Sequence, residues 1–130
     1  MAPKKVLVVD DEQDTLDFVS AVLEDEGVEI LSARDGDAGL KAARAHRPDL
    51  IVLDLQMPGK DGLTVLIELR QDEAMKATPV IILTGVGRAT GVKFSKSDVG
   101  DFVGEEPDAY VEKPVAPEAF RSTVRRLLQL

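Results

Sequence analysis

The sequence predicts an α/β protein built on a five-stranded parallel sheet, with helices on both faces of the sheet. Short apolar segments of strand length alternate along the chain with segments in which apolar residues recur every three or four positions. Three of the five apolar segments are continuous, which is typical of strands covered on both faces. Repeated βα units imply parallel strands joined by right-handed crossovers, and a chain of 130 residues suits one such domain.

Five segments have the strand-length, apolar character expected of this sheet. They are rich in valine, isoleucine and leucine, which favour buried strands, and polar or turn-forming residues follow them. The approximate bounds of the predicted strands are Lys5–Val9, Glu29–Ala33, Leu50–Leu53, Val80–Thr84 and Ala109–Glu112.

Four segments have helical spacing. In the first, Leu16, Val19 and Leu23 share one helix face, and Gly27 is expected to end the helix because glycine readily adopts the left-handed conformation found there. The other predicted helices are an alanine-rich segment over 37–45, a segment opened by Asp61, and a last segment with Pro117 near its first turn, marked by Phe120, Val124, Leu127 and Leu128.

The segment from Gly85 to Pro107 has no clear periodicity. It holds half of the 10 glycines of the chain, and each glycine inside a helix costs about 1 kcal/mol relative to alanine. We expect it to be mostly loop with one or two short helical turns, and to form a mobile or partner-specific surface.

The composition narrows the class of protein. The net charge of −8 argues against direct nucleic-acid binding, and the absence of cysteine excludes disulfides and thiolate metal sites. No apolar run is long enough to span a membrane, and the first residues lead directly into a strand without a signal peptide. We therefore expect a cytoplasmic protein with a single domain over residues 1–130 and no output domain.

Polar residues stand where four of the predicted strands stop. Asp10 and Asp11 follow the first strand, and Asp54 follows the third. Thr84 ends the fourth strand, and Lys113 follows the fifth. Because ligands of open parallel sheets bind at the carboxyl ends of the strands, these residues are expected to form one site. Carboxylates gathered in this way repel one another unless a cation lies among them.

These residues and their local motifs closely resemble the receiver domain of bacterial two-component response regulators. The matching motifs are Val-Leu-Val-Val-Asp-Asp-Glu at 6–12, Asp-Leu-Gln-Met-Pro-Gly-Lys-Asp-Gly at 54–62 and Asp-Ala-Tyr-Val-Glu-Lys-Pro at 108–114. The resemblance covers nearly the whole chain. It implies a flavodoxin-like, doubly wound sheet with the strand order 2-1-3-4-5.

The resemblance also implies that Asp54 accepts a phosphoryl group in a Mg²⁺-dependent reaction. A carboxylate can attack phosphorus to give an acyl phosphate, and the reaction depends mainly on alignment and charge neutralisation. Asp11 and Asp54 would bind Mg²⁺ through their side chains and Gln56 through its backbone carbonyl, while Asp10 would act mainly through a bound water.

Further roles follow from the same resemblance. Lys113 would pair with Asp54 at rest and with a phosphoryl oxygen afterwards, and a cis bond before Pro114 would aim the lysine. Thr84 would donate its hydroxyl to the phosphoryl group, and Tyr110 would swing inward to fill the space that the threonine leaves. Phosphorylation would thereby change the surface offered to partners.

The expected partners are a sensor histidine kinase or phosphotransfer protein and an unknown downstream protein. The chain is expected to be a monomer or weak dimer, because the stretch from Thr84 to Lys113 is longer than usual where the family has its common signalling surface. It is not expected to be an enzyme beyond its own phosphorylation and dephosphorylation. Two alternatives are a haloacid-dehalogenase-type phosphatase, disfavoured by Gln56 where a second acid is needed, and a protein-interaction module that works without phosphate.

Overall fold

Five parallel strands form one sheet in the order β2-β1-β3-β4-β5. The computed structural model describes residues 3–57, 59–85, 109–113 and 116–130, and for residues 84–85 and 109–113 it describes the backbone alone. The order confirms the sheet that the family resemblance implied. The elements are β1 (Lys5–Val9), α1 (Gln13–Val22), a 3-10 helix (Glu24–Glu26), β2 (Glu29–Ala33), α2 (Gly36–His46), β3 (Leu50–Asp54), α3 (Gly62–Gln71), β4 (Val80–Gly85), β5 (Ala109–Lys113) and α5 (Pro117–Leu128).

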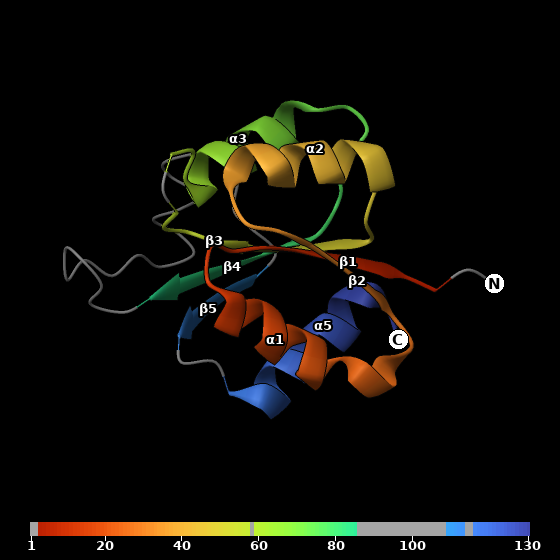
Figure 1. The fold of residues 1–130 in the computed structure, drawn as a ribbon. Helices are drawn as coiled ribbons and strands as arrows, with labels where there is room; N and C mark the ends of the chain where they lie inside the picture. The colour runs from red at the N-terminus through yellow and green to blue at the C-terminus, as the bar shows by residue number, and fades with distance from the viewer. Residues whose placement is uncertain (1–2, 58, 86–108, 114–115) are drawn as a thin grey trace.

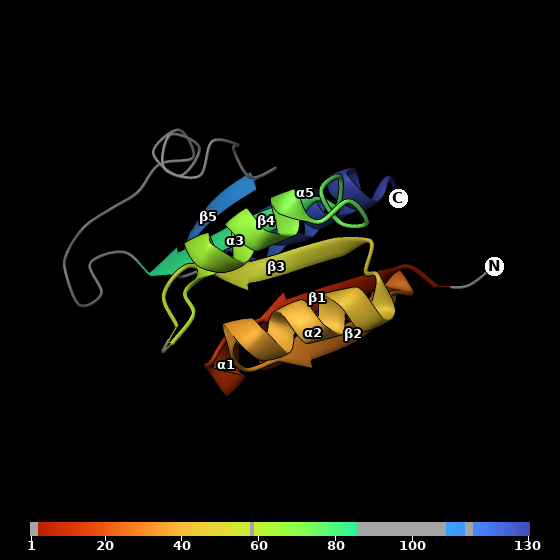
Figure 2. The same ribbon diagram turned by 90° about the horizontal axis from the view of Figure 1, so that it is seen from above.

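Helices cover both faces of the sheet, with α2 and α3 on one side and α1 and α5 on the other (Figure 1). The view from above shows α2 over β1 and β2 (Figure 2). Alternate residues of β1 and β3 face opposite layers: Leu7 and Ile51 belong to the core under α2 and α3, and Val8 and Val52 belong to the core with α1 and α5. This two-sided burial explains the continuous apolar runs in the sequence.

Side-chain caps and left-handed residues set the helix ends. Asp61 opens α3 as predicted, because its Oδ1 accepts a hydrogen bond from the Thr64 amide at 2.9 Å. Asp35 caps α2 in the same way, through the Ala38 amide at 2.8 Å. Beyond α1, the 3-10 helix ends at Gly27, whose φ of 72° lies in the left-handed region.

Three strands run one residue further than predicted, and the extra residues lie at the carboxyl edge of the sheet. The ladder pairs Asp54 with Leu83 and Gly85 with Lys113. The prediction ended these strands at the last residue before a polar or glycine residue, but the ladder uses only backbone groups, so a polar side chain does not end it. Asp54 is therefore the last residue of β3 rather than the first residue of a loop.

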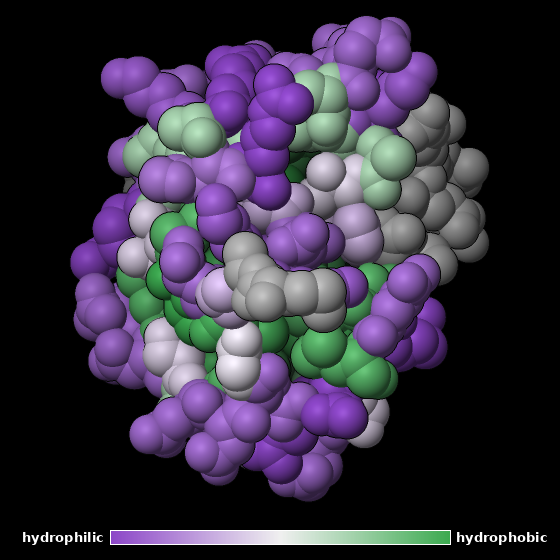
Figure 3. Space-filling model, turned by 90° about the vertical axis from the view of Figure 1, so that its right-hand side faces the viewer, coloured by the Kyte–Doolittle hydropathy of each residue, from purple (hydrophilic) through white to green (hydrophobic). Residues whose placement is uncertain are grey.

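The opposite edge of the sheet carries the amino ends of the strands. Seen from that side, the most hydrophobic residues lie at mid-height with some hydrophilic residues among them, and hydrophilic residues predominate above and below (Figure 3). Among the described residues, no helix combines the length and the apolar character that crossing a membrane requires. The predicted loop at 85–107 begins one residue too early, because Gly85 is the last residue of β4, and the rest of it lies outside the described residues.

Candidate functional site

The sheet register brings the predicted site positions to one edge. Val9 of β1 pairs with Leu53 of β3, so Asp10 and Asp54 stand one position further along adjacent strands. Thr84 lies one position beyond the partner of Asp54 on β4 and pairs with Glu112 of β5. Together with Lys113 at the end of β5, these residues come from four adjacent strands at the carboxyl edge, which is where open parallel sheets bind ligands.

Two of these residues are fully buried carboxylates. Asp10 and Asp54 each have a relative exposure of 0%, and they are the buried charged residues of the described part of the chain. Asp54 continues the alternation of Leu50 and Val52, so its side chain lies on the α1 and α5 side of the sheet. Burying a carboxylate is costly unless a partner or a cation compensates its charge. The burial of two at neighbouring strand ends therefore indicates a functional site.

The loop between β1 and α1 adds two further carboxylates. Ligand oxygens of Asp10, Asp11 and Glu12 all lie within 4.8 Å of one another. One oxygen of Asp10 accepts a hydrogen bond from the Glu12 amide at 2.9 Å. Asp11 Oδ1 is buried and accepts no hydrogen bond from the described residues. An orphaned carboxylate oxygen among other carboxylates fits a hard divalent cation such as Mg²⁺, which prefers oxygen ligands.

The loop after Asp54 packs against Gly62, the first residue of α3. The Gly62 amide donates to the Leu55 carbonyl at 3.0 Å, which closes the turn that contains Gln56. A Cβ atom at Gly62 would lie 2.2 Å from the carbonyl oxygen of Asp54. Only glycine allows this approach, so Gly62 sets the position of the Asp54 backbone. Gln56 itself is half-buried in this loop, within reach of the same edge.

The remaining predicted residues are placed only through the backbone. Thr84 belongs to β4, and Tyr110 and Lys113 belong to β5. Their proposed roles stay predictions, as do those of Asp10, Asp11, Asp54 and Gln56. Pro114 and its expected cis bond lie outside the described residues.

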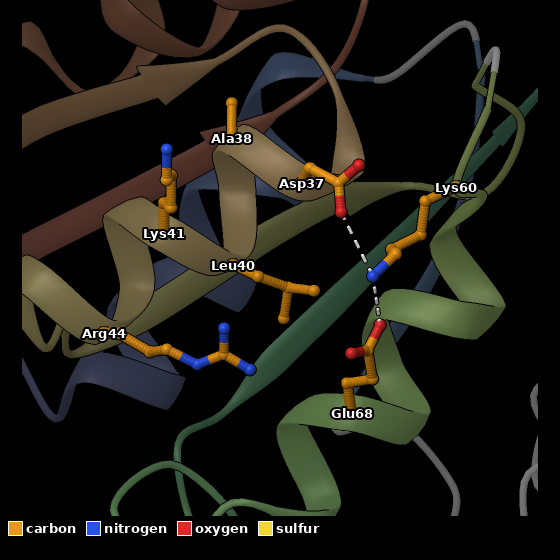
Figure 4. A pocket seen from close by; sticks show the side chains of 7 residues that line it. All are labelled: Asp37, Ala38, Leu40, Lys41, Arg44, Lys60 and Glu68. Atoms are coloured by element: carbon orange, nitrogen blue, oxygen red, sulfur yellow. Dashed lines mark hydrogen bonds and ion pairs between the residues drawn. The ribbon is translucent and has the colours of Figure 1, made fainter.

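A separate groove lies between α2 and α3, on the other side of the sheet from the Asp54 side chain. It has a volume of about 450 Å³ and includes Leu40, Arg44 and Lys60 in its lining (Figure 4). Lys60 Nζ lies 2.6 Å from Glu68 Oε2 and 3.1 Å from Asp37 Oδ1. The lysine thus links the β3–α3 loop to the first turn of α2 and the middle of α3.

These contacts predict an alkaline pH dependence. Hydrogen bonds to Glu68 and Asp37 raise the pKa of Lys60 above its ordinary value of 10.5, because they favour the charged form. The stabilisation is therefore complete below pH 10.5 and is lost as the pH rises through the higher pKa of the folded state. In urea titrations, the difference in unfolding free energy between the wild type and Lys60→Met should be constant from neutral pH up to pH 10.5 and should shrink above it. A difference that grows there would contradict the assignment.

The fold and the site together define the class of protein. A sheet of order β2-β1-β3-β4-β5 with buried aspartates at the ends of β1 and β3 is the architecture of a flavodoxin-like signalling receiver. The family model "Response regulator receiver domain" matches residues 6–125. The chain belongs to the response regulator receiver domain family.

Similar proteins agree with this assignment. The chain is 37% identical over 126 residues to the alkaline phosphatase synthesis transcriptional regulatory protein PhoP of Bacillus subtilis, covering 97% of this chain and 49% of PhoP. It is 32% identical to the polar-differentiation response regulator DivK of Brucella anthropi, covering 97% of both chains. The chemotaxis protein CheY4 of Vibrio cholerae has a similar structure, with a TM-score of 0.81, 32% identity, and coverage of 97% of this chain and 99% of CheY4. The chain thus spans about half the length of PhoP and nearly the whole length of DivK.

Proposed function

We propose that this chain is the phosphoacceptor domain of a two-component system and that Asp54 receives the phosphoryl group from a histidine kinase or a phosphotransfer protein. The observation that carries the proposal is the pair of fully buried carboxylates, Asp10 and Asp54, at the ends of adjacent strands, together with the orphaned oxygen of Asp11, the residue after Asp10. Membership of the receiver family supports it. We propose the cytoplasm as the location, because that is where kinases of this type transfer phosphate.

The chemistry follows from the donor set. An Asp54 carboxylate oxygen attacks phosphorus and forms an acyl phosphate, while the bond from phosphorus to the donor breaks and its electron pair leaves with the donor. Asp10, Asp11, Asp54 and the Gln56 carbonyl would hold Mg²⁺, which neutralises charge on the phosphoryl oxygens when bound. Lys113 and Thr84 are proposed to contact those oxygens.

Transfer of a phosphoryl group replaces the single negative charge of the Asp54 carboxylate with a phosphoryl group that carries about −1.5 to −2 at neutral pH, and it adds new acceptor oxygens. We propose that Thr84 and Tyr110 relay this change to a surface that binds a downstream protein. A coupling of about 1–3 kcal/mol would shift the population of the binding-competent state without locking it. The chain itself would not turn over external substrates, and its charge of −8 disfavours direct nucleic-acid binding.

Phosphoryl uptake tests the proposal directly. The protein is incubated with acetyl phosphate and Mg²⁺, and the intact mass is measured over time. We expect the mass increase of a single phosphoryl group, and no increase when EDTA replaces Mg²⁺. Absence of any increase with Mg²⁺ would overturn the proposal and favour an interaction module that works without phosphate. Steady release of phosphate from varied phosphate esters would instead favour a phosphatase.

Removal of the cation gives a second test that does not depend on phosphorylation. A ligand that binds only the folded state at 100 times its dissociation constant stabilises that state by about 2.7 kcal/mol. Mg²⁺ at such a concentration should therefore raise the melting temperature of the wild type, and EDTA should reverse the rise. In Asp11→Asn the rise should be largely lost. An equal rise in Asp11→Asn would show that Asp11 does not hold the ion.

A further inference from the structure

Arg34 reaches from the end of β2 to the loop that carries the acidic residues. Its Nη2 and Nε atoms donate to the Asp11 carbonyl oxygen at 2.9 Å and 3.3 Å. Its Nη1 donates to Gln13 Oε1 at 3.1 Å. The side-chain Nε2 of Gln13 in turn donates to Asp17 Oδ1 at 2.9 Å. One exposed side chain thus binds both the loop and the first turn of α1.

The same loop is held at its other residues. The Asp10 amide donates to the Ala33 carbonyl at 3.1 Å, so the residue before Arg34 fixes the start of the loop. Asp10 Oδ1 accepts from the Glu12 amide at 2.9 Å. The end of β2 therefore binds the loop at two points: the Ala33 carbonyl accepts from Asp10, and the Arg34 side chain donates to Asp11.

These hydrogen bonds hold the loop in place against the repulsion among its carboxylates. Three acids with ligand atoms within 4.8 Å repel one another when no cation is bound, and an unrestrained loop would relieve that repulsion by spreading. A planar guanidinium can place two N–H groups on one oxygen, whereas the compact ammonium of lysine cannot reproduce this fork. Held in this way, Asp11 keeps its buried Oδ1 in the site before an ion arrives.

We propose that Arg34 is a positioning residue for the divalent cation site. It holds the backbone of Asp11, so that less ordering has to accompany binding of the ion. The inference rests on the proposed function, since it requires that Asp11 binds a cation. Arg34 is not itself a ligand, because its charge is of the same sign as that of the ion.

The charge of Arg34 acts in the opposite direction from its hydrogen bonds. A cation near the site repels Mg²⁺, so if Arg34 acted through charge alone, its loss would strengthen Mg²⁺ binding. Arg34→Lys keeps the positive charge but loses the paired hydrogen bonds to the Asp11 carbonyl, while Arg34→Ala loses both the charge and the hydrogen bonds. The pair of variants therefore separates a positioning role from an electrostatic one.

Isothermal titration of the unphosphorylated protein with Mg²⁺ tests the proposal. We expect the dissociation constant of Arg34→Lys to be about five- to tenfold higher than that of the wild type, the size of effect that one or two lost hydrogen bonds give. Arg34→Ala should also bind more weakly. Arg70→Ala is the matched control, because Arg70 Nη1 likewise donates to two backbone carbonyls, those of Lys76 and Thr78, near the amino end of β4. Its Mg²⁺ affinity should equal that of the wild type.

Each result bears on a different claim. If Arg34→Lys binds Mg²⁺ as tightly as the wild type, or Arg34→Ala binds it more tightly, the positioning role is overturned while the proposed function stands. If the wild type itself binds no Mg²⁺, both proposals fail. In Mg²⁺-free buffer, the Asp11 and Glu12 amide resonances should shift or broaden in Arg34→Lys and stay unchanged in Arg70→Ala, which reports on the loop independently of the ion.

Discussion

Asp54→Asn is expected to take up no phosphoryl group from acetyl phosphate and Mg²⁺. The amide has nearly the shape of the carboxylate but lacks the anionic oxygen that attacks phosphorus, so no acyl phosphate can form. Intact mass spectrometry should therefore show the unmodified mass at every time point. The variant should also have the far-ultraviolet circular dichroism spectrum of the wild type, which shows that it is folded.

Asp49→Asn is the matched control for this change. Asp49 immediately precedes β3 at the opposite end of the strand, and its Oδ2 accepts a hydrogen bond from the Lys5 amide at 2.8 Å. The variant is expected to lose about 1 kcal/mol of stability at most and to be phosphorylated at the wild-type rate. Full phosphorylation of Asp54→Asn, or loss of phosphorylation in Asp49→Asn alone, would place the acceptor elsewhere.

Gly62→Ala is expected to impair both folding and phosphorylation. The added Cβ would lie 2.2 Å from the Asp54 carbonyl oxygen and 2.8 Å from the Leu55 Cα, and both are backbone atoms that cannot rotate away. Overpacking of this kind costs about 1–3 kcal/mol, and we expect the upper end of that range. The backbone at Asp54 must shift to relieve the contact, and a misplacement of about 1 Å at a reacting group can slow a reaction about 100-fold.

Chemical denaturation and the rate of mass increase measure the two effects. Gly27→Ala is the control, because the φ of 72° at Gly27 lies in the left-handed region but a Cβ atom there would meet nothing within 4 Å. Gly27 also lies far from Asp54 in the chain. It should lose about 1–2 kcal/mol through backbone strain and keep its phosphorylation rate. Equal slowing in both variants would show that general destabilisation, not displacement of Asp54, is responsible.

The sheet and much of its acidic edge could be predicted from the sequence for a physical reason. Strands buried on both faces leave continuous apolar runs, and parallel connections force their carboxyl ends to one edge. Asp10 and Asp54 directly follow or end such runs, so their place at one edge follows from the strand assignment, whereas their proximity depends on the pairing of β1 with β3. The confirmed strand order came from the family resemblance, since the alternation of elements does not determine which strands are neighbours.

The supports of the site could not be predicted because they depend on contacts between distant parts of the chain. Arg34 follows a strand and would pass for an ordinary solvated cation, yet its partner carbonyl is 23 residues away in sequence. Gly62 follows a helix-capping aspartate, and nothing local shows that it faces the Asp54 backbone. In the sequence, Glu12 is only part of a motif and has no predicted role in metal binding. An acid directly after two others could have indicated a third oxygen donor.

The side chain and the backbone of Asp54 contact different helix layers, one on each side of the sheet. The carboxylate belongs to the half with α1 and α5, whereas the main chain of the same residue rests on Gly62 of α3 in the other half. A dye or surface tether attached to exposed Lys41 on α2 would therefore lie in the layer of α2 and α3, which contacts only the backbone of Asp54. That layer offers a place to immobilise the protein while the chemistry proceeds on the opposite side.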